Sequence, residues 1–214
     1  MSKTALFRGL TEENVKKMIA CMHVKTEKFN PGETIMSYNR NIEIVGVLED
    51  GSAALVSFDE SGNRMMLDLY DKDAVFGEYF SVCSGIDAAS VIAVTPCTVL
   101  FFHYRDLISP CENNCAFHAT FSKNLISLLT KRLRSQASHI EALSKRTIRG
   151  KLLAFFEMRI KETDVLSFTL PFSLSTLADF LSVDRSAMQR ELKKLREEGI
   201  LYSKGRKIEI LKRF

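Results

Sequence analysis

The stretch from Ser173 to Glu198 constrains the fold of this chain more than any other part of its 214 residues. Apolar residues recur there at helical spacing in two short runs, and Ser182-Val183 lies between the runs. Ser173 precedes the first run and Asp184 precedes the second, and the side-chain oxygens of both residue types accept backbone N–H groups at the start of a helix. The stretch therefore predicts two short helices joined by a tight turn.

The second predicted helix has two different faces. Met188, Leu192 and Leu195 follow the spacing i, i+4, i+7, so we expect them to face inward. The opposite face carries polar side chains, most of them long donors: Arg185, Ser186, Gln189, Arg190 and Lys193. Such side chains at the start of an exposed helix reach base edges and phosphates in a major groove. A solvated basic face is the alternative, but the agreement of caps, turn and donors favours DNA binding, with Ser173 as a further contact.

The C-terminal third of the chain is basic. From Lys145 to the end there are 16 Lys and Arg against 9 Asp and Glu, whereas the rest has 14 against 17. This asymmetry is typical of a polyanion-binding module attached to a domain with another role. Residues 199–201 and 204–210 follow the helix pair and predict a two-stranded wing.

The N-terminal half predicts an antiparallel β domain. Thr11 to Met22 has a capping Thr and helical apolar spacing, which predicts a helix. From Lys25 to His103, short apolar runs are separated by turn signals. The predicted strands are 44–48, 53–58, 65–69, 90–94 and 98–103. Asp50-Gly51 lies between the first two of them and predicts a hairpin.

A long helix is predicted from about Asn114 to Leu143. One stripe on it has the 3-4 spacing of a two-stranded coiled coil and consists of Ile126, Leu129, Leu133, Gln136, Ile140 and Leu143. A second stripe lies beside it and would pack on the β domain: Phe117, Phe121, Leu125 and Leu128. Two stripes favour two neighbours, so we expect a homodimer through the five apolar residues of the first stripe, with an ordinary core helix as the alternative. Residues 144–146 are the predicted hinge, followed by a helix over 148–160 and a strand near 168–170.

The composition excludes several classes of protein. A hydrophobic content of 46% and a charged content of 26% are typical of a globular chain. No apolar run approaches the length of a membrane span and the N-terminus has no signal-peptide core, so we expect a cytoplasmic protein without a membrane role, whose five cysteines are free thiols. No arrangement of residues suggests catalysis. An enzyme or ligand-binding protein with an incidental helix hairpin is the alternative to a regulator.

In this order, a β-roll, a long dimer helix and a winged helix-turn-helix resemble the catabolite activator/Fnr (Crp/Fnr) superfamily of bacterial transcription regulators. The residues that carry the resemblance are Phe76-Gly77-Glu78, Lys131-Arg132-Leu133 and the run from Val183 to Leu192. The resemblance implies an α+β fold: a cyclic-nucleotide-binding-like β-roll sensor domain over 1–113, a dimerisation helix over 114–144 and a winged helix-turn-helix DNA-binding domain over 145–214.

The resemblance also implies partners and DNA contacts. Family residues matching Arg185 and Arg190 contact DNA, with Ser186 and Gln189 at neighbouring reading positions. The catabolite activator has a glutamate where this chain has Ser186, so we expect a different operator preference. The implied partners are double-stranded DNA with an inverted-repeat operator, a second copy of the chain, and RNA polymerase.

The sensor end departs from the cyclic-nucleotide-binding members that the chain resembles. Those members hold the cyclic phosphate with an Arg-Ser pair, matched here by Ala88-Ala89, and meet the purine with a Thr-Ser pair, matched by Gln136-Ala137. Without the arginine, burial of a phosphate lacks its counter-charge. We therefore expect an effector of unknown identity other than cyclic AMP. The implied effector pocket comprises Gly77, Glu78, Tyr79, Phe80, Ala88, Ala89 and Gln136.

A redox, metal or haem sensor of the same fold is the remaining alternative. Cys111 and Cys115 have the spacing C-x3-C and could act with His118. An Fnr-type iron–sulfur cluster does not fit, because no cysteine precedes Cys21. Two small residues near a helix N-terminus are the commoner meaning of such a pair, and the spacing alone predicts no metal ligand.

Overall fold

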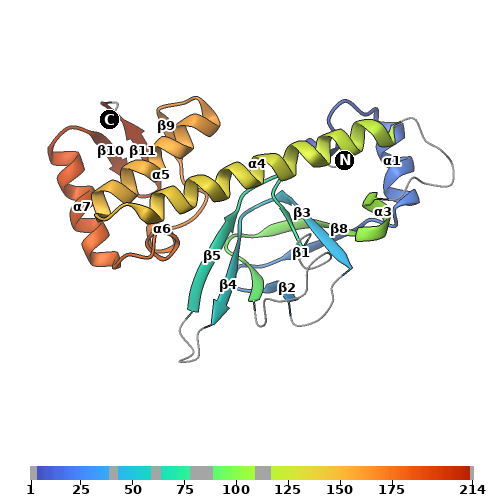
Figure 1. Ribbon diagram of the computed structural model, residues 1–214, viewed down its shortest axis with the longest axis horizontal. Coiled ribbons are helices and arrows are strands. Elements are labelled where there is room, and N and C mark those ends of the chain that lie inside the picture. The colour runs from blue at the N-terminus through green and yellow to red at the C-terminus, as the bar shows by residue number, and fades with distance from the viewer. Residues whose placement is uncertain (1–3, 39–42, 59–63, 78–88, 109–116, 213–214) are drawn as a thin grey trace. The chain divides into compact units, whose positions relative to one another are not determined.

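The computed structural model describes residues 4–38, 43–58, 64–77, 89–108 and 117–212. The fold is α+β, with an N-terminal β domain, one long helix and a C-terminal helical domain with a small sheet (Figure 1). The chain divides into two compact units, Met1–Arg132 and Leu133–Phe214. Helix α4 (His118–Ser144) contributes residues to both units, and the predicted boundaries after residues 113 and 144 stay a prediction.

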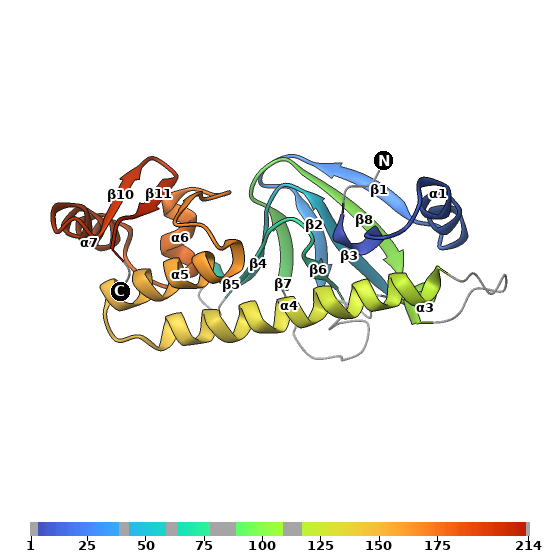
Figure 2. The same ribbon diagram turned by 90° about the horizontal axis from the view of Figure 1, so that it is seen from above.

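The N-terminal unit contains two antiparallel four-stranded sheets, which can be followed in Figure 2. The order in one sheet is β1 (Lys25–Phe29), β8 (Cys97–His103), β3 (Ile44–Asp50) and β6 (Val75–Phe76). The order in the other is β2 (Thr34–Tyr38), β7 (Ala89–Ala93), β4 (Ala53–Phe58) and β5 (Arg64–Tyr70). Buried side chains from both sheets form one core cluster, to which Leu48 and Val99 contribute from the first and Tyr70 and Val91 from the second. The five predicted strands are confirmed within a residue or two, whereas β1, β2 and β6 were not predicted.

The predicted hairpin at Asp50-Gly51 is wrong. Strand β3 pairs with β6 and β8, while β4 pairs with β5 and β7, so the two strands beside this turn belong to different sheets. Gly51 has a φ of 89°, and a Cβ atom there would collide with the carbonyl oxygen of Pro96. The Asp-Gly pair correctly marks a tight turn with positive φ. It does not determine whether the flanking strands pair edge to edge or pass from one sheet to the other.

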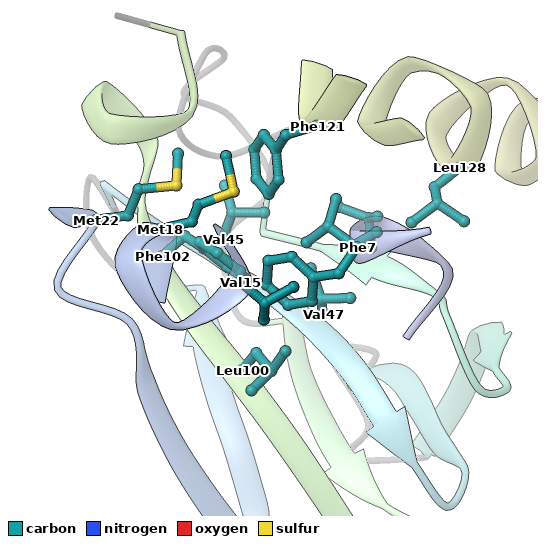
Figure 3. Close-up of a cluster of buried hydrophobic side chains, with 12 residues drawn as sticks. Phe7, Val15, Met18, Met22, Val45, Val47, Leu100, Phe102, Phe121 and Leu128 are labelled. Atoms are coloured by element: carbon teal, nitrogen blue, oxygen red, sulfur yellow. The ribbon is translucent and has the colours of Figure 1, made fainter. Parts of the chain in front are cut away.

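A second core cluster lies against β3 and β8 (Figure 3). It receives side chains from the 3-10 helix η1 (Ala5–Phe7), from α1 (Glu12–Cys21) and from the first half of α4. Phe121 and Leu128 of α4 are buried in it, and Phe117 and Leu125 pack on it partly buried. The prediction that this stripe packs on the β domain is confirmed. A short helix, α3 (Tyr104–Ile108), follows β8.

The C-terminal unit packs the second part of α4 and three further helices with a small sheet. The three further helices are α5 (Ile148–Thr163), α6 (Leu174–Phe180) and α7 (Arg185–Glu197). The sheet has the order β10 (Leu201–Lys204), β11 (Lys207–Ile210) and β9 (Ser167–Thr169). The predicted two-stranded wing is confirmed by the pairing of β10 with β11, and the strand predicted near 168–170 is β9, which adds a third strand to the same sheet by pairing with β11. No helix within the described parts of the chain is long and apolar enough to cross a membrane.

Candidate nucleic-acid interface and sensor segment

The helix pair α6–α7 has the predicted caps and turn. The Ser173 side chain accepts the backbone N–H of Thr176 at 3.1 Å, and Asp184 accepts that of Ala187 at 2.7 Å. Between the helices, Ser182 has a φ of 50°, in the left-handed region that favours glycine. These contacts satisfy donors that a helix start leaves open and determine where each helix begins.

Helix α7 presents the two faces that the sequence predicts. Met188, Leu192 and Leu195 are buried in the domain core. The predicted DNA-binding residues on the other face are all exposed: Arg185, Ser186, Gln189, Arg190 and Lys193. Ser173 is exposed at the start of α6. The structure thus brings four long polar side chains and two hydroxyl groups to the surface of one helix pair.

Contacts from α5 hold the C-terminal end of α7. Arg149 forms hydrogen-bonded ion pairs with Glu198 and with Glu191, the latter at 3.4 Å. The hydrogen bond to Glu198 raises the pKa of Arg149, and the same bond lowers the pKa of the Glu198 carboxyl. Sequence reasoning did not find this attachment, because nothing in local spacing pairs residues on separate helices. It links α7 to α5 within the domain.

Two side chains satisfy the C-terminal carbonyl groups of α6. The ring of His139 stacks on Phe180 at 3.7 Å, and its Nε2 lies 2.9 Å from the Phe180 carbonyl oxygen. Lys151 donates to the carbonyl oxygen of Leu181 at 3.0 Å, a favourable place for a cation. The turn between α6 and α7 is therefore fixed from both α4 and α5.

One of the predicted DNA contacts has an acidic partner across this turn. Arg185, the first residue of α7, donates from Nη2 to both carboxylate oxygens of Asp179, at 3.0 and 3.1 Å, and from Nε at 3.3 Å. Both side chains are exposed to solvent, by 60% and 42%. Asp179 is the last residue but one of α6, and it was not among the predicted functional residues.

The predicted dimer stripe on α4 is partly exposed. Ile126, Leu133 and Ile140, each seven residues apart, are exposed by 64%, 66% and 65%. Leu129, Gln136 and Leu143 are half-buried. The exposed apolar row has the period of a coiled-coil seam. Its role in a dimer stays a prediction.

Only part of the predicted effector pocket lies within the described residues. Gly77 has a φ of 90°, and a Cβ atom on it would lie 2.6 Å from the carbonyl oxygen of Ile44. Glycine is thus required here by the backbone and by packing. Ala89 is buried in β7, and Gln136 is half-buried on α4. The other four pocket residues lie outside the described residues: Glu78, Tyr79, Phe80 and Ala88.

A buried arginine of α4 binds two residues of β5 near Gly77. Nη2 of Arg132 lies 3.3 Å from Oδ2 of Asp68 and donates to the Tyr70 hydroxyl at 2.9 Å. Its guanidinium carbon is 4.5 Å from the centre of the Tyr70 ring, which stacks on Phe76, the residue before Gly77. Only 12% of the Arg132 and Asp68 side chains is exposed. The sequence indicates Arg132 only as part of a motif shared with the family, and it does not predict the contacts with Asp68 and Tyr70.

The alternative metal or redox site falls mainly outside the described residues. Cys111 and Cys115 lie outside the described residues, within which no group of three His, Cys, Asp or Glu side chains is arranged to hold a metal ion. The buried Nε2 of His118 has no hydrogen-bond partner among the described residues. At Cys97, burial raises the pKa of the thiol, which disfavours the reactive thiolate there.

Together, these features define a protein with an antiparallel β domain, a long helix with an exposed apolar row, and a winged helix-turn-helix whose second helix has a basic exposed face. Two domain families match the sequence: the cyclic nucleotide-binding domain over residues 26–114 and the Crp-like helix-turn-helix domain over residues 150–213. The two matches together cover most of the chain. The chain belongs to the Crp/Fnr family of transcription regulators, which are not enzymes. No curated protein sequence matches it closely.

Solved structures share the fold at low sequence identity. FixK2 from Bradyrhizobium japonicum is 20% identical with a TM-score of 0.68, over 89% of this chain and 93% of that one. A CooA variant from Carboxydothermus hydrogenoformans is 15% identical with a TM-score of 0.73, over 99% and 93%. The c-di-GMP-responsive global regulator CLP of Xanthomonas campestris is 16% identical with a TM-score of 0.66, over 94% and 100%. At these identities the likeness shows the fold alone.

Proposed function

We propose that this effector-responsive, DNA-binding regulator acts as a homodimer that reads an inverted-repeat operator with helix α7. The observation that carries the proposal is the recognition face of α7, with its row of exposed donors on a capped helix held by Arg149. We also propose RNA polymerase as its protein partner, as the family resemblance implies.

The exposed side chains of α7 would divide between bases and phosphates. Arg185 and Arg190 have the planar, two-pronged donor that matches the O6 and N7 acceptors of guanine. Ser186 and Gln189 lie on the same exposed face and would read neighbouring bases. Lys193 lies further along the helix and would contact a phosphate, as would Ser173 at the start of α6.

The dimer would form through the exposed row on α4. Ile126, Leu133 and Ile140 leave apolar surface in water, and each such side chain contributes about 1.5–3 kcal/mol when fully buried. A parallel pairing of two α4 helices would bury all three from each chain. Two-fold symmetry of such a dimer requires two recognition helices related by the same axis, hence half-sites about one turn of DNA apart.

We propose that the effector is a small, partly apolar molecule other than cyclic AMP. Ala88 and Ala89 stand where the cyclic-nucleotide-binding members have their phosphate-binding Arg-Ser pair. Gly77 does not argue for a nucleotide, because packing against Ile44 already requires a glycine there. The guanidinium of Arg132 is engaged by Asp68, which supports the view that it supplies no spare positive charge for a phosphate.

The DNA proposal is tested by selecting binding sites from a randomised duplex library with the full chain, followed by footprinting of the selected sites. The expected result is an inverted repeat protected on two successive major grooves. Selected sites without two-fold symmetry would contradict the dimeric operator, and no enrichment at all would contradict sequence-specific binding.

The effector proposal is tested separately by a thermal-shift screen of cyclic nucleotides, haem and small aromatic or acidic metabolites. A ligand that binds only the folded state raises the melting temperature in a saturable manner. Saturable stabilisation by a small metabolite supports the proposal. Saturable stabilisation by cyclic AMP at micromolar concentration would contradict it.

A further inference from the structure

We propose that Asp179 is a positioning residue for base recognition: it holds the guanidinium of Arg185 so that the opposite edge of that group reads a guanine. This inference rests on the proposed function, because it presumes that α7 binds in a major groove. It assigns a role in specificity to a residue of α6, outside the recognition helix.

The hydrogen bonds use one edge of the guanidinium group. Asp179 accepts from Nε at 3.3 Å and from Nη2 at 3.0 and 3.1 Å, and these two nitrogens form the side edge of the planar group. The end edge consists of Nη1 and the second N–H of Nη2. Among the described residues, Nη1 of Arg185 has no hydrogen-bond partner, so the two-pronged end remains available to a ligand.

The backbone on both sides of this pair is fixed. Arg185 is the first residue of α7, directly after the capping Asp184. The carbonyl groups that end α6 are bound by His139 and Lys151. A long arginine side chain loses rotamer freedom when it binds, and a partner that holds it beforehand reduces this loss. Asp179 therefore favours one orientation of Arg185 before DNA arrives.

The charge of Asp179 adds to the effect of its geometry. A phosphate attracts any exposed arginine, whereas an exposed carboxylate beside that arginine repels phosphates and lowers affinity for DNA of any sequence. Guanine offers two neutral acceptors to the remaining edge of Arg185 and carries no such repulsion. The pair thereby shifts Arg185 from a phosphate contact towards a base contact.

Lys193 provides a contrast on the same helix. Its only described ion pair is with Glu197, at 3.7 Å one turn further along α7, and both side chains are well exposed. The lysine ammonium is a compact charge with rotatable donors and no planar two-pronged edge, so a neighbouring carboxylate cannot orient it towards a base as it can a guanidinium. Removal of Glu197 should therefore change the general affinity for DNA and leave base preference unaltered, which makes Glu197→Ala a matched control.

The test measures base preference position by position. The variants Asp179→Ala, Asp179→Asn, Arg185→Ala and the Asp179/Arg185 double alanine variant are compared with Glu197→Ala and the wild-type chain. Each competes for a panel of operators with single base changes in one half-site, and melting temperatures are recorded alongside. We expect Arg185→Ala to remove preference at one position, and Asp179→Ala to reduce guanine preference at that position about tenfold.

The control and the conservative variant separate positioning from a structural role. Asp179→Ala and Glu197→Ala should both raise affinity for unrelated DNA, but only the first should change base preference. Asp179→Asn keeps an acceptor oxygen and should give an intermediate preference. In the Arg185→Ala background, the loss of Asp179 should have no further effect at that position.

Wild-type base preference in Asp179→Ala would overturn the proposal, as would an equal loss at every position together with a lowered melting temperature. An effect of Asp179→Ala that persists without Arg185 would also overturn it. A wild-type chain without sequence preference would overturn the proposed operator recognition and this inference together. These failures are distinguishable because the first three require a wild-type preference to be present.

Discussion

Helices α4 and α7 both bury an apolar face within the chain, but their outer faces differ. Outside its buried residues, α4 carries the exposed apolar row Ile126, Leu133 and Ile140. On its outer face α7 carries arginine and lysine side chains, with Arg185 and Arg190 near the start of the helix. Exposed apolar surface is stabilised when another apolar surface covers it, and exposed basic surface is stabilised when it binds a polyanion. The inner face of each helix thus indicates how one chain folds, and the outer face indicates what kind of partner the helix binds.

The largest effect is expected on the inner face of α4. Phe121 is buried against Phe7 and Phe102, with ring centres 6.0 and 6.1 Å away. Phe121→Ala should lower the free energy of unfolding by about 3–5 kcal/mol, since it leaves a cavity in this cluster. The measurement is urea unfolding followed by circular dichroism. Phe121→Leu is the control and should lose less; a loss as small as that of a surface substitution would show that this face of α4 is not a core face.

Leu133 tests the outer face of the same helix. Leu133→Asp places a charge in the exposed row and should convert dimers to monomers in analytical ultracentrifugation, with the fold retained because Leu133 is 66% exposed within one chain. Lys131→Asp introduces the same carboxylate two residues earlier, off the seam, and should leave the dimer intact. A Leu133→Asp dimer of unchanged affinity would exclude this row as the main interface.

Arg190 tests the outer face of α7. Arg190→Ala should weaken binding to the selected operator by about 1–3 kcal/mol and relax preference at one base position. Arg196→Ala removes the same charge from the exposed C-terminal end of α7 and serves as the control. Competition against operators with single base changes measures both. An equal loss across all sequences would make Arg190 a phosphate contact.

Lys193 is expected to have the smallest effect. Lys193→Ala should weaken binding evenly across sequences and reduce the slope of log affinity against log salt by about one. Affinities for operator and unrelated DNA over a series of salt concentrations measure this. If the Arg185, Arg190 and Lys193 variants all lose affinity equally and without sequence dependence, α7 binds only phosphates. The outer face of α7 would then differ from that of α4 in charge but would not read base sequence.

Local periodicity accounts for what the sequence alone determined. The caps Ser173 and Asp184, the inner residues of α7 and the stripe of Phe121 and Leu128 on α4 follow the predicted pattern. Helical faces and caps depend on residues three or four positions apart, so a short stretch of sequence is enough to predict them. The family resemblance rests on such short stretches too, and the sequence alone is therefore enough to indicate the class of protein.

The tertiary structure decided what pairs with what. The turn at Gly51 was evident, but its passage between two sheets depends on β7 and β8, which begin 38 and 46 residues further along the chain. The third strand of the wing sheet, the Arg132–Asp68 pair and the Arg149–Glu198 pair likewise join distant segments. Asp179 holds Arg185 only because the turn brings the end of α6 back to the start of α7. Such contacts arise from the packing of whole helices and strands against one another, and the spacing of residues within one helix or strand does not predict them.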